Sequence, residues 1–169
     1  GFGTIIDIEK CDLKNVNIGK FNLFTGPFTL QMDSKSSIEF GNLFRCGEWT
    51  TDEKFLNLNF SRSLEIGKNV TITNKHYFDI AGLIKISDDS WIAGYGSQFW
   101  THGGNVVDKD IIIERNCYIG SAVCFAPGTK FSINTMVGLG SVVAKKFEQD
   151  NVLVAGSPAK VKKENFNWT

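Results

Sequence analysis

Bulky apolar residues recur at every sixth position along the stretch from Ile111 to Ala144. The repeated positions are Ile113, Ile119, Phe125, Phe131, Val137 and Val143. The residue after each is usually small, and the fifth of each six is small or β-branched. A period of six matches neither the turn of an α-helix nor the two-residue alternation of a simple strand. It indicates three strand-like residues and a tight corner, repeated, and therefore predicts a parallel β-helix in which three units complete one triangular coil.

The same period occurs earlier in the chain, with interruptions. Its apolar positions are Ile18, Phe24, Leu30, Ile38 and Phe44, then Phe60, Ile66, Ile72 and Phe78, then Ile86 and Ile92. The segment from Asn42 to Glu53 breaks the pattern and predicts a corner loop or a coil distorted by insertion. We therefore expect one all-β domain over 1–169, with a lead-in strand or cap over 1–17, coils over 18–144 and a tail over 145–169.

Between Ile92 and Ile113 the period fails for 21 residues, three more than one full coil. Some of these residues must leave the coil, and the sequence predicts an extruded loop around 100–110. Its glycines, which include Gly103 and Gly104, allow backbone conformations that other residues resist. An excursion from so regular a coil is where binding or catalytic residues are expected.

The C-terminal tail carries a helix-start signal. Ser157 fits an N-cap, and Pro158 fits the first helical turn. The sequence therefore predicts a short helix from Pro158 to about Phe166.

Composition narrows the class of protein. The 169 residues are 42% hydrophobic and have a formal net charge of zero, which predicts no bulk attraction to nucleic acid or membranes. No apolar run approaches the length that a membrane helix needs. The cysteines show no CxxC pairing, and Cys117 falls at a small-residue position that predicts a buried free thiol. With no signal peptide recognisable at its start, the chain is expected in a reducing cytoplasm.

Three motifs resemble the hexapeptide-repeat acyltransferases: residues 116–128, 137–143 and 154–160. Residues 78–82 and 97–103 resemble those members that acetylate sugars during the synthesis of bacterial capsules, lipopolysaccharides and exopolysaccharides. The resemblance is strong from about Leu64 to Lys163. It implies a left-handed parallel β-helix, a homotrimer, acetyl-CoA as the donor, and one essential histidine in each site at a subunit boundary.

His102 is the candidate catalytic residue, because it lies in a glycine-bounded loop where the resemblance implies the family's base. Transfer of an acetyl group to a hydroxyl needs a base, and imidazole, with an ordinary pKa of about 6.5, suits that task. Asp79 lies about one coil earlier and is expected either to orient His102 or bind a sugar hydroxyl, or else to cap backbone amides. Trp100 is a candidate for acceptor contact or plain packing, and His76 for an acceptor-site or structural role.

Donor binding is expected to use small corners and cations. Gly120, Ala126 and Gly138 keep the corners small enough for pantetheine to lie along the coils, although the fold itself also needs small residues there. Lys145 and Lys160 belong to a lysine cluster near the C-terminus that can hold the CoA phosphates, although such a cluster is often only a solvated face. No metal is expected.

Other functions remain open alternatives. A zinc enzyme of the carbonic-anhydrase type needs three histidine ligands, and the chain has only two histidines. Acylation of an amino sugar's nitrogen uses the same base as acylation of a hydroxyl. A non-catalytic β-helix that serves as an assembly subunit has no need of a histidine in a glycine-rich loop. Cys124 is a rival nucleophile, but no base adjoins it in sequence.

Overall fold

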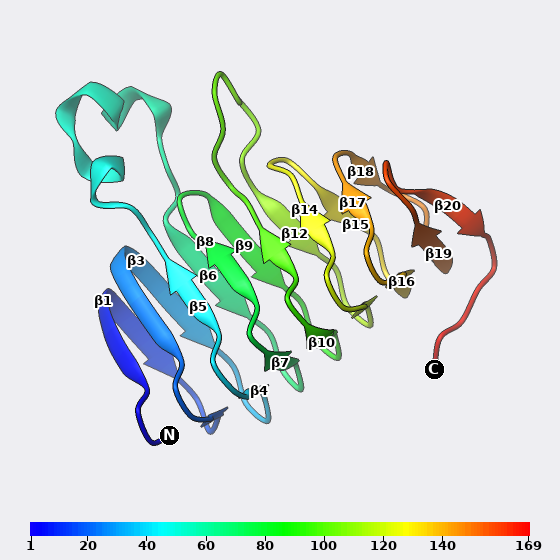
Figure 1. Cartoon of the computed structure of the whole chain (residues 1–169), viewed down its shortest axis with the longest axis horizontal. Coiled ribbons are helices and arrows are strands. Elements are labelled where there is room, and N and C mark those ends of the chain that lie inside the picture. Colours follow the sequence, from blue (N-terminus) through cyan, green and yellow to red (C-terminus); the bar gives the residue numbers. More distant parts are fainter.

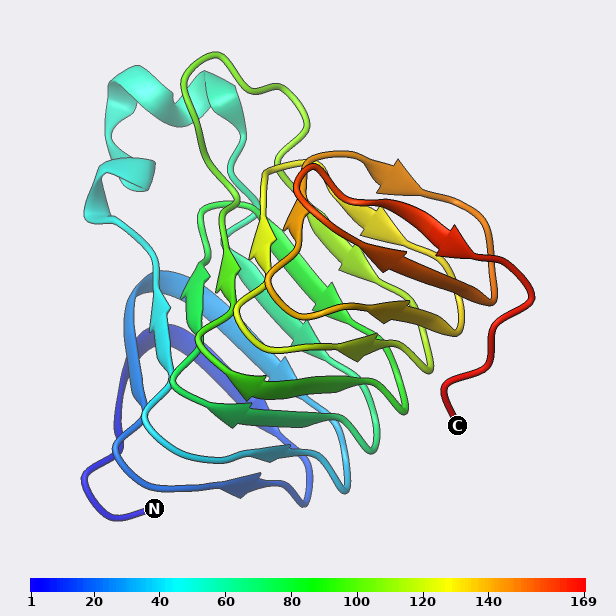
Figure 2. The ribbon, with the colours of Figure 1, turned by 45° about the vertical axis from the view of Figure 1, so that its right-hand side comes forward.

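The computed structural model describes all 169 residues. The chain winds into stacked triangular coils (Figure 1). Strands of successive coils pair in parallel, as the view along the coils shows (Figure 2). The coil has three faces, which we number in the order in which the chain crosses them. The predicted all-β parallel β-helix is confirmed.

Short strands in register make up the three faces. Face 1 contains β5 (Leu43–Arg45), β8 (Tyr77–Asp79), β11 (Gln98–Phe99), β14 (Cys124–Phe125) and β17 (Val142–Val143). Face 2 contains β6 (Ser63–Ile66), β9 (Leu83–Ile86), β12 (Ile111–Ile113), β15 (Lys130–Phe131) and β18 (Lys146–Phe147). Face 3 contains β2 (Asn17–Ile18), β4 (Ser37–Ile38), β7 (Thr71–Asn74), β10 (Trp91–Tyr95), β13 (Tyr118–Ile119), β16 (Thr135–Val137), β19 (Val152–Ala155) and β20 (Lys160–Lys163). The longer β1 (Ile5–Leu13) and β3 (Leu23–Met32) each continue from face 1 to face 2 and join them into one 12-stranded sheet.

A column of stacked phenylalanines fills the interior behind face 1. Its members are Phe24, Phe44, Phe78, Phe99 and Phe125, and the centroids of neighbouring rings lie 4.3, 4.6, 4.4 and 4.4 Å apart. All five are buried. Similar columns, mainly of isoleucine and valine, lie behind the other two faces. Burial of one such side chain stabilises the fold by about 1.5–3 kcal/mol, so the repeated columns are its main source of stability.

One assignment to the repeated apolar positions is wrong, and one interior position escapes the six-residue period. Phe60 lies outside the coil and is only half-buried, while the buried Leu64 pairs with Leu30 in the interior. Phe99, which the six-residue period left outside the coil, is fully buried in the phenylalanine column. Both differences arise because extra residues before each position shift the six-residue count out of register.

The corner between faces 2 and 3 uses residues with positive φ. Asn116, Asn134 and Asn151 occupy equivalent places in successive coils with φ of 57°, 56° and 57°. Asparagine tolerates this left-handed conformation better than most residues. Their amides also form a chain, because Asn116 Nδ2 donates to Asn134 Oδ1 (3.1 Å) and Asn134 Nδ2 donates to Asn151 Oδ1 (2.7 Å). The corner residues therefore bind successive coils to one another.

The coils continue beyond residue 144, and the predicted C-terminal helix is wrong. Both β18 and β19 stack on the preceding coil, so the tail begins after Ala155. Residues Lys160–Lys163 form β20, antiparallel to β19. Capping signals act only locally, whereas the edge of β19 presents unpaired N–H and C=O groups that a returning strand satisfies.

Two segments leave the coil at the corner between faces 1 and 2, and both project from the same edge of the molecule (Figure 1). The first, residues 46–62, carries the 3-10 helices η1 (Glu48–Thr51) and η2 (Glu53–Leu58), and we call it the insertion. The second, residues 101–110, is the predicted extruded loop, which is confirmed. The insertion agrees with the corner loop that was one of the two alternatives predicted for this part of the chain. One coil, with β8 and β9, lies between the two excursions.

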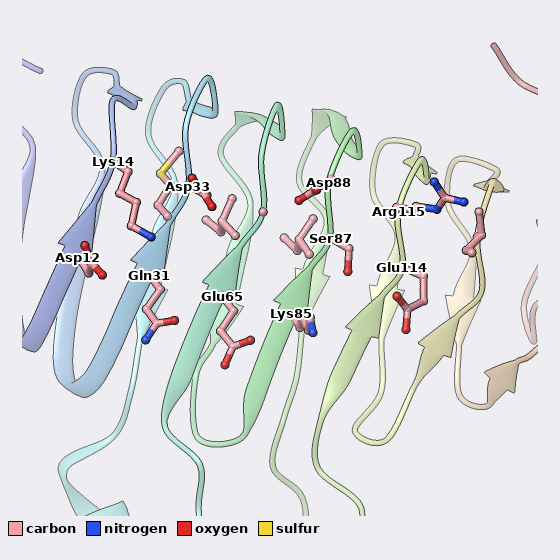
Figure 3. A pocket seen from close by; sticks show the side chains of 15 residues that line it. Asp12, Lys14, Gln31, Asp33, Glu65, Lys85, Ser87, Asp88, Glu114 and Arg115 are labelled. Carbon is pink, nitrogen blue, oxygen red and sulfur yellow. The ribbon is translucent and has the colours of Figure 1, made fainter.

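The outer surfaces of the three faces differ. Face 2 bears charged and polar side chains on successive strands, including Asp12, Glu65 and Lys85 (Figure 3). Face 3 carries aromatic residues, and the C-terminal tail folds back against one of them: the Trp168 ring lies 5.2 Å from that of Tyr118. Face 1 carries a row that is largely apolar and is uncovered in this chain. Its members are Leu23, Leu43, Tyr77, Gln98, Cys124 and Val142.

Candidate active site

Asp79 lies on the corner of the coil between the two excursions. It ends β8 on face 1 and is buried. Its Oδ2 accepts hydrogen bonds from the backbone N–H of Thr101 (2.9 Å) and from the Thr101 hydroxyl (3.1 Å). The carboxyl group therefore caps the start of the loop, as one of the sequence alternatives for Asp79 predicted.

The base of the loop is fixed at both ends. The Thr101 hydroxyl also accepts from the N–H of Gly82 (2.8 Å), and Asp110 Oδ1 accepts from the N–H of Leu83 (2.9 Å). Gly82 permits this approach, because a Cβ there would lie 3.1 Å from Cβ atoms of both Thr101 and Lys109. These contacts position the residue after Thr101 without help from the rest of the loop.

That residue is His102. Its Nδ1 lies 2.7 Å from Asp79 Oδ2, and its side chain is 39% exposed, against 6% for that of Asp79. An ionised carboxylate only accepts hydrogen bonds, so this contact favours the tautomer with the proton on Nδ1. The other ring nitrogen, Nε2, has no hydrogen-bond partner in the chain and is left to accept a proton. The contact agrees with the other role predicted for Asp79, that of orienting His102.

Two tryptophans flank the imidazole of His102. The ring of Trp49, from the insertion, lies 5.3 Å away, and that of Trp100 lies 6.4 Å away. Trp100 packs on Tyr77 at 4.8 Å and donates from its indole nitrogen to Gln98 Oε1 at 3.2 Å. Sequence reasoning selected Trp100 but not Trp49, whose only signal was a poor fit to the repeat.

A cleft of about 670 Å³ separates the insertion from the loop, and His102 is part of its wall. The insertion contributes Trp49, Phe55, Asn57, Leu58, Asn59 and Phe60, and the loop contributes the segment from His102 to Val107 together with Lys109. Trp100 is not part of this wall. The cleft is therefore a concave space that His102 borders.

The structure does not bring His76 to this site. The ring is 1% exposed inside the coil, where Nδ1 accepts from the N–H of Ser97 (3.0 Å) and Nε2 lies 3.1 Å from the Thr73 hydroxyl. Burial lowers the pKa of His76 to about 4, since desolvation disfavours the charged ring. Its acceptor-site role is not supported, and the structural alternative agrees with these contacts.

The residues predicted to bind the donor lie on different corners. Ala126 lies on the corner between faces 1 and 2, one coil beyond Trp100, whose N–H bonds Phe125 O at 3.1 Å. Gly120 and Gly138 stack on each other at the corner between faces 3 and 1. Lys145 and Lys160 are exposed, and no carboxylate pairs with either. Their roles stay predictions.

The remaining side-chain chemistry is sparse. Nowhere in the 169 residues do three or more His, Cys, Asp or Glu side chains gather as a metal site would require. Cys117 is buried, so the predicted buried free thiol is confirmed, and burial raises the pKa of this thiol to about 12. None of the helices has the length and apolarity to cross a membrane.

Comparisons with known proteins extend the sequence resemblance. The galactoside O-acetyltransferase of Escherichia coli (strain K12) is 28% identical over 111 residues, which are 64% of this chain and 54% of that protein. The galactoside O-acetyltransferase of Lactococcus lactis is 36% identical over 61 residues, which are 36% of this chain and 29% of that protein. The chain thus spans about half or less of the length of these relatives. No protein-family model matches the chain.

Solved structures extend the resemblance to the fold. The polysialic-acid-specific acetyltransferase NeuO superposes with a TM-score of 0.62 at 19% identity, covering 99% of this chain and 89% of that one. A hexapeptide-repeat acetyltransferase of Vibrio cholerae complexed with acetyl-CoA gives 0.51 at 18% identity, covering 96% and 71%. The fold is the left-handed parallel β-helix of these acetyltransferases. In sequence and in fold, the chain thus resembles the hexapeptide-repeat acetyltransferases, as its motifs predicted.

Proposed function

We propose that this chain is an acetyltransferase that moves an acetyl group from acetyl-CoA to a hydroxyl of a sugar or nucleotide sugar, in the synthesis of a capsule, lipopolysaccharide or exopolysaccharide. The observation that carries the proposal is the contact between Asp79 and His102, a residue that lines a cleft and whose Nε2 has no hydrogen-bond partner in the chain. The resemblance to galactoside O-acetyltransferases supports the choice of donor and acceptor.

The reaction needs both substrates bound together. The acceptor hydroxyl attacks the thioester carbonyl carbon while His102 Nε2 takes the hydroxyl proton. The tetrahedral intermediate then collapses, the carbon–sulfur bond breaks, and the imidazolium returns the proton to the thiolate of CoA. The positioning of two substrates and the supply of a base together account for much of the acceleration in such reactions. Asp79 acts as a positioning residue, because it fixes the tautomer that leaves Nε2 unprotonated.

Direct transfer is favoured over an acyl-enzyme. Cys124, the rival nucleophile, points outward from face 1 and pairs across the sheet with Gln98 and Val142. Neither neighbour is a base, and an activated thiol needs a base or a cation close by. No covalent intermediate is therefore required.

Acetyl-CoA is the proposed donor, and no metal takes part. Pantetheine would lie along the small corners at Gly120, Ala126 and Gly138. Lys145 and Lys160 would contact the CoA phosphates, and their freedom from ion pairs supports that role. Salt should weaken such exposed contacts.

A homotrimer is the proposed assembly, with sites at subunit boundaries. Face 1 is the proposed surface for self-association, because its outer row is largely apolar and uncovered, whereas face 2 is charged and the tail packs against part of face 3. Trp100 and His102 lie at the edge of face 1, so a partner seated there would adjoin the imidazole. Threefold closure of such a surface is a common solution.

The test is CoA release from acetyl-CoA in the presence of candidate sugars, for the full chain and its variants. Replacement His102→Ala should lower kcat by roughly a hundredfold or more, as expected for loss of a general base, while sedimentation still shows a trimer and CoA affinity persists. Cys124→Ala is the matched control and should keep near-normal turnover. Near-normal turnover of His102→Ala with an inactive Cys124→Ala would establish an acyl-enzyme instead.

Two outcomes separate the alternative functions. Transfer to an amino sugar but not to its hydroxyl analogue would identify an N-acyltransferase. Absence of CoA release with every sugar, from a folded trimer, would favour the assembly subunit.

A further inference from the structure

The cleft between the insertion and the loop has one wall that the sequence repeat does not explain. Trp49 is half-buried there, and its ring packs edge-on against Phe55 (5.4 Å) and Phe60 (5.1 Å). Gly47 permits this position, because a Cβ at Gly47 would overlap the indole nitrogen. The chain thus holds a flat aromatic surface 5.3 Å from the ring of His102, between centroids.

The wall of the cleft contains a single cationic residue. Lys109 is the only Lys, Arg, Asp or Glu residue in its wall. The Lys109 ammonium donates to the carbonyl of Leu58 in the insertion (3.0 Å) and to that of Val107 in the loop (3.3 Å), and it lies over the Phe60 ring. The cation therefore joins the two walls of the cleft, and an anion could pair fully with it only by drawing it away from these two carbonyls.

The other polar groups of the wall are uncharged. The side-chain amides of Asn57, Asn59 and Asn105 offer both donors and acceptors, which suit hydroxyl groups. A carboxylate in this cleft would lose water and would have to compete with two carbonyls for the Lys109 ammonium, whereas a neutral hydroxyl group would not. Ligand sites of this kind combine aromatic surface with a few polar groups that fix orientation.

We propose that this cleft is the acceptor site and that it binds a neutral pyranose, with the apolar face of the sugar ring against Trp49 and its hydroxyls toward the asparagine amides. The inference rests on the proposed function, because it places the acceptor hydroxyl beside His102. It makes the insertion, not the coil, the element that selects the sugar. Trp100, which does not line the cleft, then belongs to the face 1 surface.

The first experiment measures steady-state kinetics with a neutral methyl hexopyranoside and with the matching methyl hexuronoside, which differs by its carboxylate. Trp49→Ala should raise KM for the neutral sugar about tenfold, with kcat and the KM for acetyl-CoA changing by less than about threefold. Trp49→Phe should recover most of the affinity. Trp91→Ala, a tryptophan on face 3 that is 44% exposed, is the matched control and should behave as the unmodified protein. For the unmodified protein, kcat/KM should be at least about tenfold higher with the neutral sugar than with the hexuronoside.

The second experiment needs no acetyl transfer: calorimetric titration of the same two sugars into the full chain without acetyl-CoA. If the neutral sugar binds and Trp49→Ala weakens that binding, the result supports the cleft as a sugar-binding site. This holds even where the transferase proposal fails. Active transfer with an unchanged KM in Trp49→Ala, or tighter binding of the hexuronoside, would overturn the inference and leave the transferase proposal standing.

Discussion

The coils and the two excursions of this chain differ in what fixes each side chain. In the coils, a residue is held by equivalent residues above and below it, as the ring of Phe99 is held between those of Phe78 and Phe125. In the excursions no position repeats, and Trp49 and His102 meet once, from segments 53 residues apart. The candidate site lies where repetition stops, at the corner between faces 1 and 2. The coil supplies rigidity and Asp79, while the excursions supply the imidazole and the cleft.

The strongest test of this difference compares one substitution in the two regions. Phe99→Ala should lower the free energy of unfolding by about 3–5 kcal/mol, because it removes a buried ring and leaves a cavity inside a stack. Phe55→Ala, the same change in the insertion, should cost no more than about 1 kcal/mol, because less apolar area is lost. Urea unfolding followed by circular dichroism measures both. Equal losses would mean that the insertion and the coils unfold as one cooperative unit.

The next effect is a pH dependence of stability, and it arises at a polar corner that recurs in successive coils. Asn22, Asn42, His76 and Ser97 occupy equivalent corners, and His76 must stay neutral there. Its pKa falls from an ordinary 6.5 to about 4 on burial. Above pH 6.5 both the folded and unfolded chains carry a neutral ring, so stability is unaffected. As pH falls from about 6.5 to about 4, only the unfolded chain gains the proton, and stability falls by on the order of 3 kcal/mol.

The measurement is urea unfolding at several pH values for the unmodified chain and for His76→Gln, which has no titrating ring. The difference in unfolding free energy between the two proteins should shrink as pH falls through this window. A difference that stays constant from pH 7 to pH 4 would show that His76 is not held neutral, and the interior corner would then be more hydrated than the contacts indicate.

The same difference explains what the sequence could predict. Because the coils repeat, their structure can be predicted from the sequence. The fold, the extruded loop and most interior positions follow from the six-residue period. The assignment of Phe60 fails, and Phe99 escapes the period, where extra residues shift the count. The helix predicted from Pro158 fails because a local capping signal cannot register the free edge of β19.

The candidate site is less predictable from sequence, for a physical reason. The contact between Asp79 and His102 spans one coil, so the period places the two side chains near each other. The contact of Trp49 with His102 joins two non-repeating segments, and no periodicity encodes it. The roles of Thr101 and Asp110 in holding the loop are hydrogen bonds to the coil below, which only the folded corner creates.

The smallest expected effect concerns an ion pair that joins the loop to the coils. Lys146 on β18 pairs with Asp108 of the loop at 2.6 Å, and both side chains are about half exposed. The hydrogen bond to Asp108 raises the pKa of Lys146, so the ammonium group stays charged throughout the neutral range. Exposed pairs contribute little to global stability, and salt screens them. Their effect is local: the pair ties the far side of the loop to a coil beyond the one that fixes its base.

Lys146→Met should therefore leave the urea midpoint unchanged within error, while amide hydrogen exchange quickens over residues 103–109. Local opening of a segment depends on its own few contacts and not on the stability of the core. Lys145→Met is the matched control, because Lys145 contacts the Phe147 ring and no carboxylate, and it should leave loop exchange unchanged. High salt should bring the loop of the unmodified chain toward the exchange rate of Lys146→Met. A drop in the urea midpoint of Lys146→Met comparable to that of Phe99→Ala would mean that the loop is part of the repeating core, and the division between coils and excursions would not hold.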